Sequence, residues 1–114
     1  MSLSSHVLDA TRGVPAAGVR IRWERWHEDL WQHLADAVTD DDGRVSEWGL
    51  ASTAPTTGPG VHRLVFDSGG YFARQDVATF YPEVVVVFDV VDPDAHHHVP
   101  LLLSPFAYST YRGS

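Results

Sequence analysis

Apolar and polar positions alternate along much of this chain. Residues 19–24 (VRIRWE) carry an apolar side chain at every second position, and Leu64 and Phe66 repeat that spacing further along. A two-residue period is typical of a β-strand that buries one face. Residues 83–91 (EVVVVFDVV) are instead β-branched almost throughout, which predicts a central strand that is well covered.

Turn-forming residues separate these strands at residues 13–15, 40–43 and 92–94, where Asp, Gly and Pro favour turns. Residues 51–60 (ASTAPTTGPG) predict a loop, the most mobile part of the domain. In residues 68–80, which depart from the strand pattern, Tyr71, Phe72 and Val77 are expected to form the apolar side of a short helix. Seven or eight strands and one helix predict a single all-β domain over residues 1–114, folded as an antiparallel two-sheet sandwich.

The composition narrows the class of protein. The chain has 114 residues, 44% of them apolar, and no cysteine, which excludes disulfides and thiolate metal ligands. Its net charge is −7, and all eight of its Lys and Arg residues are arginine. An acidic chain without a basic cluster disfavours a nucleic-acid partner.

Because we find no signal peptide and no apolar run long enough for a bilayer, we expect a soluble, cytoplasmic protein without a membrane partner.

His6 is the first residue with candidate chemistry. Strand alternation places it on one face with Leu8, and Val7 and Asp9 on the other. A neutral imidazole can accept a proton near pH 7, because its ordinary pKa is about 6.5. The alternative is a half-exposed polar residue without a function.

Three carboxylates precede a glycine in residues 39–44 (TDDDGR) and suggest a calcium loop. An EF-hand, however, needs a carboxylate six residues after its glycine, and that position is Gly49. We therefore predict a tight turn that delivers Arg44 to the next strand. There Arg44 is either a solvated charge or a fixed donor for an anionic ligand.

The histidine triplet at residues 96–98 resembles a metal-binding tract. Neighbours on a strand point to opposite faces, so only His96 and His98 can share a side, and zinc usually requires three or four ligands. We therefore predict no dedicated metal site, although adventitious metal binding stays open. Pro100 lacks an amide proton, which predicts an edge strand or a bulge here.

Three segments together resemble one family: HVLDATRGVPAAGV near the start, the turn DDDGR, and the ending AHHHVPLLLSPFAYSTYRGS. They are similar to the 5-hydroxyisourate hydrolases, the transthyretin-related enzymes of urate breakdown, whose signature is a final YRGS tetrapeptide. The resemblance covers nearly the whole chain and is weakest between Ser46 and Gly60. It implies a transthyretin-like fold of two four-stranded sheets with a short helix. It also implies a homotetramer, built as a dimer of dimers, with active sites in a central channel.

The implied activity is hydrolysis of the ring amide of 5-hydroxyisourate to 2-oxo-4-hydroxy-4-carboxy-5-ureidoimidazoline, in urate catabolism toward allantoin. No cofactor or metal is implied. The matched positions comprise two groups. The catalytic ones are His6, Arg44, His98 and Ser114, and the substrate-binding ones are His6, Arg44, Tyr111, Arg112 and Gly113. The chain departs from the family pattern at His97, where tyrosine is common, and at residues 106–107, where an aromatic-glycine pair is common.

These residue types suit a hydrolysis without metal. Histidine can activate water because its pKa lies near the working pH, and the guanidinium of Arg44 can bind an anionic ring and steady its developing charge. Which histidine is the base stays open, as does whether Ser114 is a proton relay or a contact. Two other functions are the alternatives: a binding module such as transthyretin itself, which lacks this residue set, and a structural β domain whose histidines bind metal.

Overall fold

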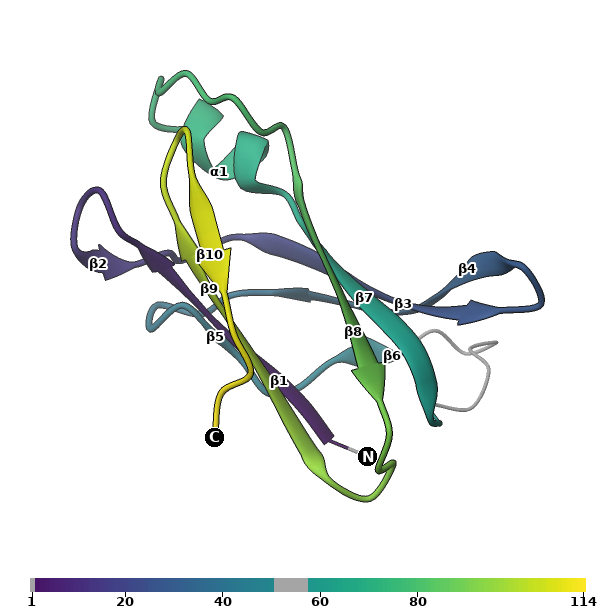
Figure 1. Ribbon diagram of the computed structural model, residues 1–114. Coiled ribbons are helices and arrows are strands. Elements are labelled where there is room, and N and C mark those ends of the chain that lie inside the picture. The colour runs from purple at the N-terminus through teal and green to yellow at the C-terminus, as the bar shows by residue number, and fades with distance from the viewer. Residues whose placement is uncertain (1, 51–57) are drawn as a thin grey trace.

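The computed structural model describes residues 2–50 and 58–114, which form two β-sheets packed face to face with one short helix (Figure 1). The first sheet contains β1 (Ser2–Asp9), β2 (Val14–Pro15), β5 (Arg44–Val45), β9 (His96–Leu103) and β10 (Tyr108–Thr110). The second contains β3 (Arg20–His27), β4 (Leu30–Val38), β6 (Gly49–Leu50), β7 (Gly60–Phe66) and β8 (Val84–Val90). The helix is α1 (Ser68–Ala73). Most of the loop expected at residues 51–60 lies outside the described residues.

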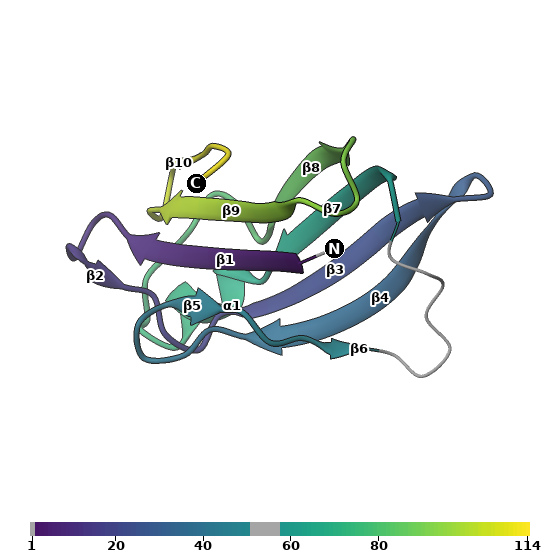
Figure 2. The same ribbon diagram turned by 90° about the horizontal axis from the view of Figure 1, so that it is seen from below.

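The first sheet joins the two ends of the sequence. Its strand order is β10-β9-β1-β2, and β5 also pairs with β1. β1 and β9 run parallel, with Ser4 opposite His98 and His6 opposite Pro100. Figure 2 shows these two strands side by side, and the chain beyond β10 returns along β9. The predicted sandwich is confirmed, but this ladder is parallel, whereas the other described ladders are antiparallel.

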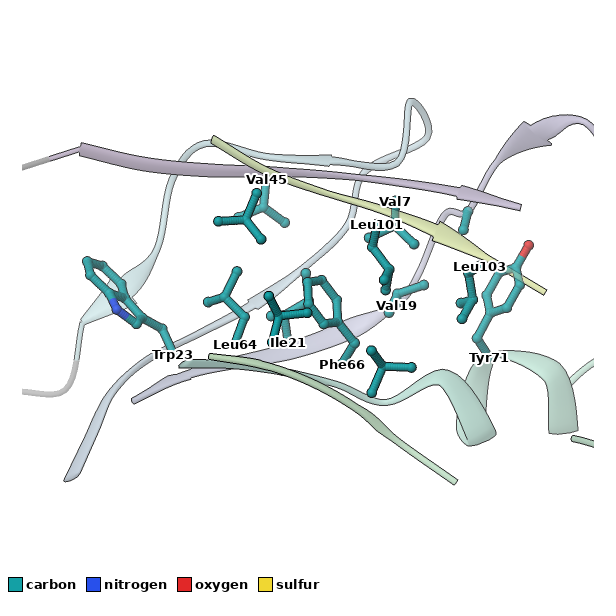
Figure 3. Close-up of a cluster of buried hydrophobic side chains, with 14 of the residues drawn as sticks. Val7, Val19, Ile21, Trp23, Val45, Leu64, Phe66, Tyr71, Leu101 and Leu103 are labelled. Atoms are coloured by element: carbon teal, nitrogen blue, oxygen red, sulfur yellow. The ribbon is translucent and has the colours of Figure 1, made fainter. Parts of the chain in front are cut away.

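The second sheet supplies much of the hydrophobic core. Its order is β6-β4-β3-β7-β8, and the alternation predicted for residues 19–24 is confirmed, because Ile21 and Trp23 are buried. They pack with Leu64 and Phe66 from β7 against residues of the first sheet (Figure 3). Burial of these apolar side chains is the main force that holds the two sheets together.

The helix closes one end of the sandwich. Asp67 caps it by accepting a hydrogen bond from the Gly70 amide at 3.0 Å. Tyr71 and Phe72 are buried, as expected. The helix ends at Ala73, so Val77 lies beyond it and is 37% exposed; the prediction that Val77 lies on the helix was wrong.

β8 is an edge strand, and the prediction of a well-covered central strand was wrong. It pairs with β7 alone among the described strands, and its burial alternates, with Val87 57% exposed. The physical reason is that β-branched residues favour any extended segment. A run of valines therefore indicates a strand without indicating how many neighbours cover it.

Pro100 also lies where the sequence did not predict it, because β9 is an interior strand. Its carbonyl oxygen accepts a hydrogen bond from the Thr110 hydroxyl at 2.6 Å. Because the N–H and C=O of a strand residue point to the same side, Pro100 lacks an N–H on the side of β10 and not on the side of β1. β10 ends at Thr110 on that side, and one isolated bridge follows, between His98 and Gly113. The register stays the same, with Thr110 opposite Leu101. The sheet thus accommodates the proline by an interruption of the ladder, without a bulge.

Candidate functional site

The candidate site lies on the outward face of the first sheet. Along β1 the inward positions are buried and the alternate positions, which include Ser4 and His6, are more exposed. The neighbouring β9 contributes His98 from the same register, and β5 contributes Arg44 directly opposite His6. Three of the predicted catalytic side chains therefore come from three adjacent strands.

The turn before β5 places Arg44 as the sequence predicted. The Asp40 side chain accepts hydrogen bonds from the amides of Asp42 and Arg44, each at 2.9 Å. Gly43 has a φ of +72°, which glycine adopts without strain. A Cβ there would also overlap the Val7 carbonyl oxygen. The carboxylate of Asp40 thus orders the backbone that carries Arg44.

His6 is held by the same turn. Its Nε2 lies 2.9 Å from the carbonyl oxygen of Asp42. A carbonyl can only accept, so Nε2–H is the donor and the neutral ring keeps its lone pair on Nδ1. The tautomer of His6 is therefore fixed by backbone geometry.

His98 is half-buried and has a different environment. Its Nδ1 lies 2.7 Å from the Ser4 hydroxyl, which leaves Nε2 as the ring nitrogen without a hydrogen bond among the described residues. The pKa of His98 is lowered, first because burial disfavours the charged imidazolium, and then because of electrostatic interactions with Arg44, His96 and His6. His98 is consequently neutral at pH 7 and can accept a proton.

The last residues of the sequence lie against His98. The Gly113 amide donates to the His98 carbonyl at 2.9 Å. A side chain at 113 would overlap the Cδ2 atom of the His98 ring, so only glycine permits this approach. Tyr111 and Arg112, between Thr110 and this bridge, are exposed. Ser114 is exposed too.

Three residues of this face were not among the site residues predicted from the sequence: Ser2, Ser4 and His96. His96 bonds to both serines, through Nδ1 to Ser2 at 2.6 Å and through Nε2 to Ser4 at 2.9 Å. The available signal was the two-residue spacing of polar residues in SLSSH, which repeats the spacing of His96 and His98. The fact that these two segments are neighbours could not be deduced from spacing alone.

The concave regions of the single chain only partly coincide with this site. A groove of about 230 Å³ runs between β8 and the chain beyond β10, and His98, Tyr111 and Arg112 line it. A larger hollow of about 550 Å³ lies on the second sheet, among Arg20, Arg22 and Asp36, away from these imidazoles. His6 and Arg44 line neither region; Arg44 is exposed and His6 is half-buried. Within the described ranges, no group of three or more His, Cys, Asp or Glu residues could hold a metal ion.

The chain is similar to known proteins over nearly its whole length. The model of the HIUase/Transthyretin family matches residues 3–113. A probable 5-hydroxyisourate hydrolase of Caenorhabditis elegans is 46% identical over 113 residues, which cover 99% of this chain and 82% of that protein. The solved structure of the Klebsiella pneumoniae 5-hydroxyisourate hydrolase superposes with a TM-score of 0.82 at 33% identity, covering 99% of this chain and 93% of that one.

A structure of sea bream transthyretin in complex with thyroxine is also similar. Its TM-score is 0.82 at 32% identity, and the match covers 97% of this chain and 93% of the transthyretin. The transthyretin-like fold implied by the sequence is thereby confirmed. The family model, the Caenorhabditis elegans relative and the solved structures together show that the chain belongs to the HIUase/Transthyretin family.

Proposed function

We propose that this protein is a 5-hydroxyisourate hydrolase, which opens the ring amide of 5-hydroxyisourate with water in the breakdown of urate. Relatives that carry this name match nearly the whole chain at 42–46% identity. The observation that carries the proposal is the convergence of His6, Arg44 and His98 on one sheet face. A hormone carrier would need no such combination of a neutral imidazole and a guanidinium.

In the proposed mechanism, His98 is the general base. Its Nε2 accepts a proton from water as the water oxygen attacks the ring carbonyl, and the C–N bond of the amide then breaks while its nitrogen takes up a proton. The lowered pKa of His98 keeps the ring neutral before the reaction. His6, whose Nε2–H is bonded to the Asp42 carbonyl, holds the water from the other side. General base catalysis of this kind typically contributes ~10²–10⁴-fold.

Arg44 and the last four residues bind the substrate. The guanidinium keeps its charge and offers planar donors that match the carbonyl groups and negative charge of the ring. It also stabilises the oxyanion that develops on the attacked carbonyl. Tyr111, Arg112 and the backbone around Gly113 contact the polar edges of the substrate, and Ser114 lies in the same tail.

We further propose that the active enzyme is a homotetramer, a dimer of dimers. Two features support this. Arg44 is exposed and His6 is only half-buried in the single chain, whereas electrostatic catalysis requires a site from which water is excluded. The edge strands β8 and β10 also leave backbone groups unpaired within the described chain, and such edges readily pair with a second strand. A neighbouring copy would both cover the site and complete the sheets.

The proposed compartment is the cytoplasm, and no cofactor is proposed. The described residues include no helix of the length and apolarity needed to cross a membrane. The compartment itself is checked by localising a tagged copy of the protein in its own cells, where a membrane-bound or exported fraction would contradict the proposal.

The activity is tested with 5-hydroxyisourate made freshly by urate oxidase. The wild-type protein should speed the loss of its absorbance, also in the presence of a chelator, while His6→Asn, Arg44→Lys and His98→Asn should each lower kcat by about 10²-fold. His33→Asn and Arg22→Lys on the second sheet are matched controls and should keep wild-type kcat. Near-normal kcat in all three site variants would refute the mechanism, and an inactive wild-type protein would refute the function.

A further inference from the structure

A row of four hydrogen-bonded side chains extends from His98 along the outer face of the first sheet. Ser4 lies opposite His98 and Ser2 lies opposite His96 in the parallel β1–β9 ladder. The links measure 2.7 Å from His98 Nδ1 to Ser4 Oγ, 2.9 Å from Ser4 Oγ to His96 Nε2, and 2.6 Å from His96 Nδ1 to Ser2 Oγ. The two imidazole rings are nearly parallel, with an interplanar angle of 17° and centroids 6.5 Å apart.

The number of protons in this row limits the directions in which its hydrogen bonds can point. Each neutral imidazole carries one N–H and each hydroxyl one proton, so only two arrangements bond every one of these groups within the row. In the first, His98 Nδ1–H donates to Ser4, Ser4 donates to His96, and His96 donates to Ser2. In the second, every bond is reversed and His98 Nε2 carries the proton. Only the first arrangement presents a lone pair at Nε2, which a base requires.

We propose that Ser4 is a positioning residue that fixes the orientation and tautomer of His98, and that it relays a proton from His98 to His96 during the reaction. The inference rests on the proposed function, in which His98 is the base. It gives Ser4 and His96 a role in the reaction, and neither residue is among the catalytic or substrate-binding residues inferred from the sequence.

The relay is balanced in protons. His98 Nε2 takes a proton from water, His98 Nδ1 passes its own proton to Ser4 Oγ, and the Ser4 hydroxyl proton moves to His96 Nε2. One positive charge is thereby transferred from the half-buried His98, which is near the charge of Arg44, to the exposed His96. Burial and the nearby charge of Arg44 disfavour a positive charge on His98. Transfer of that charge to His96 therefore favours the removal of the proton from water. Reversal of the three transfers returns the proton for the leaving nitrogen.

The matched variants are Ser4→Ala, which removes the hydroxyl, and Ser4→Thr, which keeps it and suits a strand. Ser4→Ala should lower kcat by about 10²-fold with little change in KM, because the substrate contacts remain. Ser4→Thr should restore most of the wild-type kcat. His96→Phe keeps a ring beside His98 but cannot accept a proton, and it should also lower kcat with KM unchanged.

Nitrogen-15 NMR of the histidine rings reports which ring nitrogen carries the proton. This would not change if Ser4 had a purely structural role. His98 should carry its proton on Nδ1 in the wild-type protein and in Ser4→Thr, and should lose this fixed tautomer in Ser4→Ala. A wild-type His98 protonated on Nε2, or wild-type kcat in either Ser4→Ala or His96→Phe, would overturn the inference. An inactive wild-type protein with the expected tautomer would instead refute the hydrolase function and leave the Ser4–His98 bond standing.

Discussion

The backbone amide of Gly113 donates to the carbonyl oxygen of His98 across 2.9 Å, and the absent side chain of Gly113 leaves the space that the imidazole ring occupies. This relationship ties the end of the sequence to the strand that carries the proposed base. It also explains how an exposed tail can hold a defined position, because a bridge on the far side of Pro100 fixes it.

Replacement of Gly113 by alanine should damage the site without unfolding the domain. The new Cβ would overlap the His98 ring, so either the ring or the tail must move, and displacement of a catalytic group by about 1 Å can cost ~10²-fold in rate. We expect that loss in kcat, measured with 5-hydroxyisourate, and an unchanged thermal midpoint. Gly49→Ala is the matched control, because among the described residues its Cβ would meet only the Asp36 carbonyl oxygen, at 3.5 Å. Wild-type kcat in Gly113→Ala would contradict the proposed position of His98.

The pH dependence of activity should follow His98. Burial first, and then the charge of Arg44, lower the pKa of this ring below 6.5, and the base must be neutral to accept a proton. The value of kcat/KM is therefore expected to be level near pH 7 and to fall as the pH drops through that lowered pKa.

The contribution of Arg44 to that pKa can be isolated by NMR titration of His98, which needs no activity. Arg44→Gln removes a positive charge, so the midpoint of His98 should rise toward 6.5. Arg22→Gln, on the second sheet, should leave the midpoint where it is in the wild-type protein. A midpoint above 6.5 in the wild-type protein, or one unmoved by Arg44→Gln, would show that the electrostatic account is incorrect.

Tyr71 should stabilise the fold through a buried carboxylate. Its hydroxyl donates to Asp9 Oδ2 at 2.8 Å, and Asp9 is only 1% exposed. Tyr71→Phe leaves one carboxylate oxygen without this donor, which should lower the free energy of unfolding by about 1–3 kcal/mol in urea titrations. Tyr81→Phe alters a half-buried tyrosine and should change it by less than about 0.5 kcal/mol. Equal stability of the Tyr71 and Tyr81 variants would mean that the Asp9 bond contributes little.

Local features of this fold could be predicted from the sequence because they depend on neighbouring residues. The alternation at residues 19–24 predicted β3, and the turn at residues 40–43 predicted the delivery of Arg44, since period and turn chemistry are properties of a few consecutive positions. The pairing of β1 with β9 could not be obtained in this way. Its partners lie more than 90 residues apart, and the resemblance to a family, rather than any spacing, brought His6 and His98 together.

The errors have the same origin. β8 was predicted as a central strand, and Pro100 was predicted to lie in an edge strand or at a bulge. The number of neighbours of each strand is instead decided by the packing of the whole sheet. His62 was not predicted to be buried, although it lies two and four residues before Leu64 and Phe66, on the same side of β7, and is fully buried. A histidine in phase with core residues is a usable signal, and its burial has a measurable consequence.

The burial of His62 should make the fold less stable at acid pH. Trp23 Nε1–H donates to His62 Nδ1 at 2.9 Å, and His62 Nε2–H donates to the Gly58 carbonyl at 2.8 Å. Burial lowers the pKa of His62, although the Gly58 bond acts in the opposite direction. In the unfolded chain the same ring titrates near 6.5, so below that pH the unfolded state binds more protons. The contribution of His62 to stability is therefore complete above about pH 6.5 and is lost as the pH falls toward the lowered pKa.

Urea titrations between pH 5 and 7.5 measure this effect. One proton corresponds to a slope of at most about 1.4 kcal/mol per pH unit. His62→Asn keeps an acceptor for Trp23 but cannot titrate, so it should be less stable than the wild-type protein at pH 7.5 and show a flatter dependence on pH. His27→Asn, which alters a histidine outside the core, should keep the wild-type steepness. If His62→Asn lost stability as steeply as the wild-type protein does, the acid sensitivity would have to come from other groups, and the buried Trp23–His62 pair would be a purely structural contact.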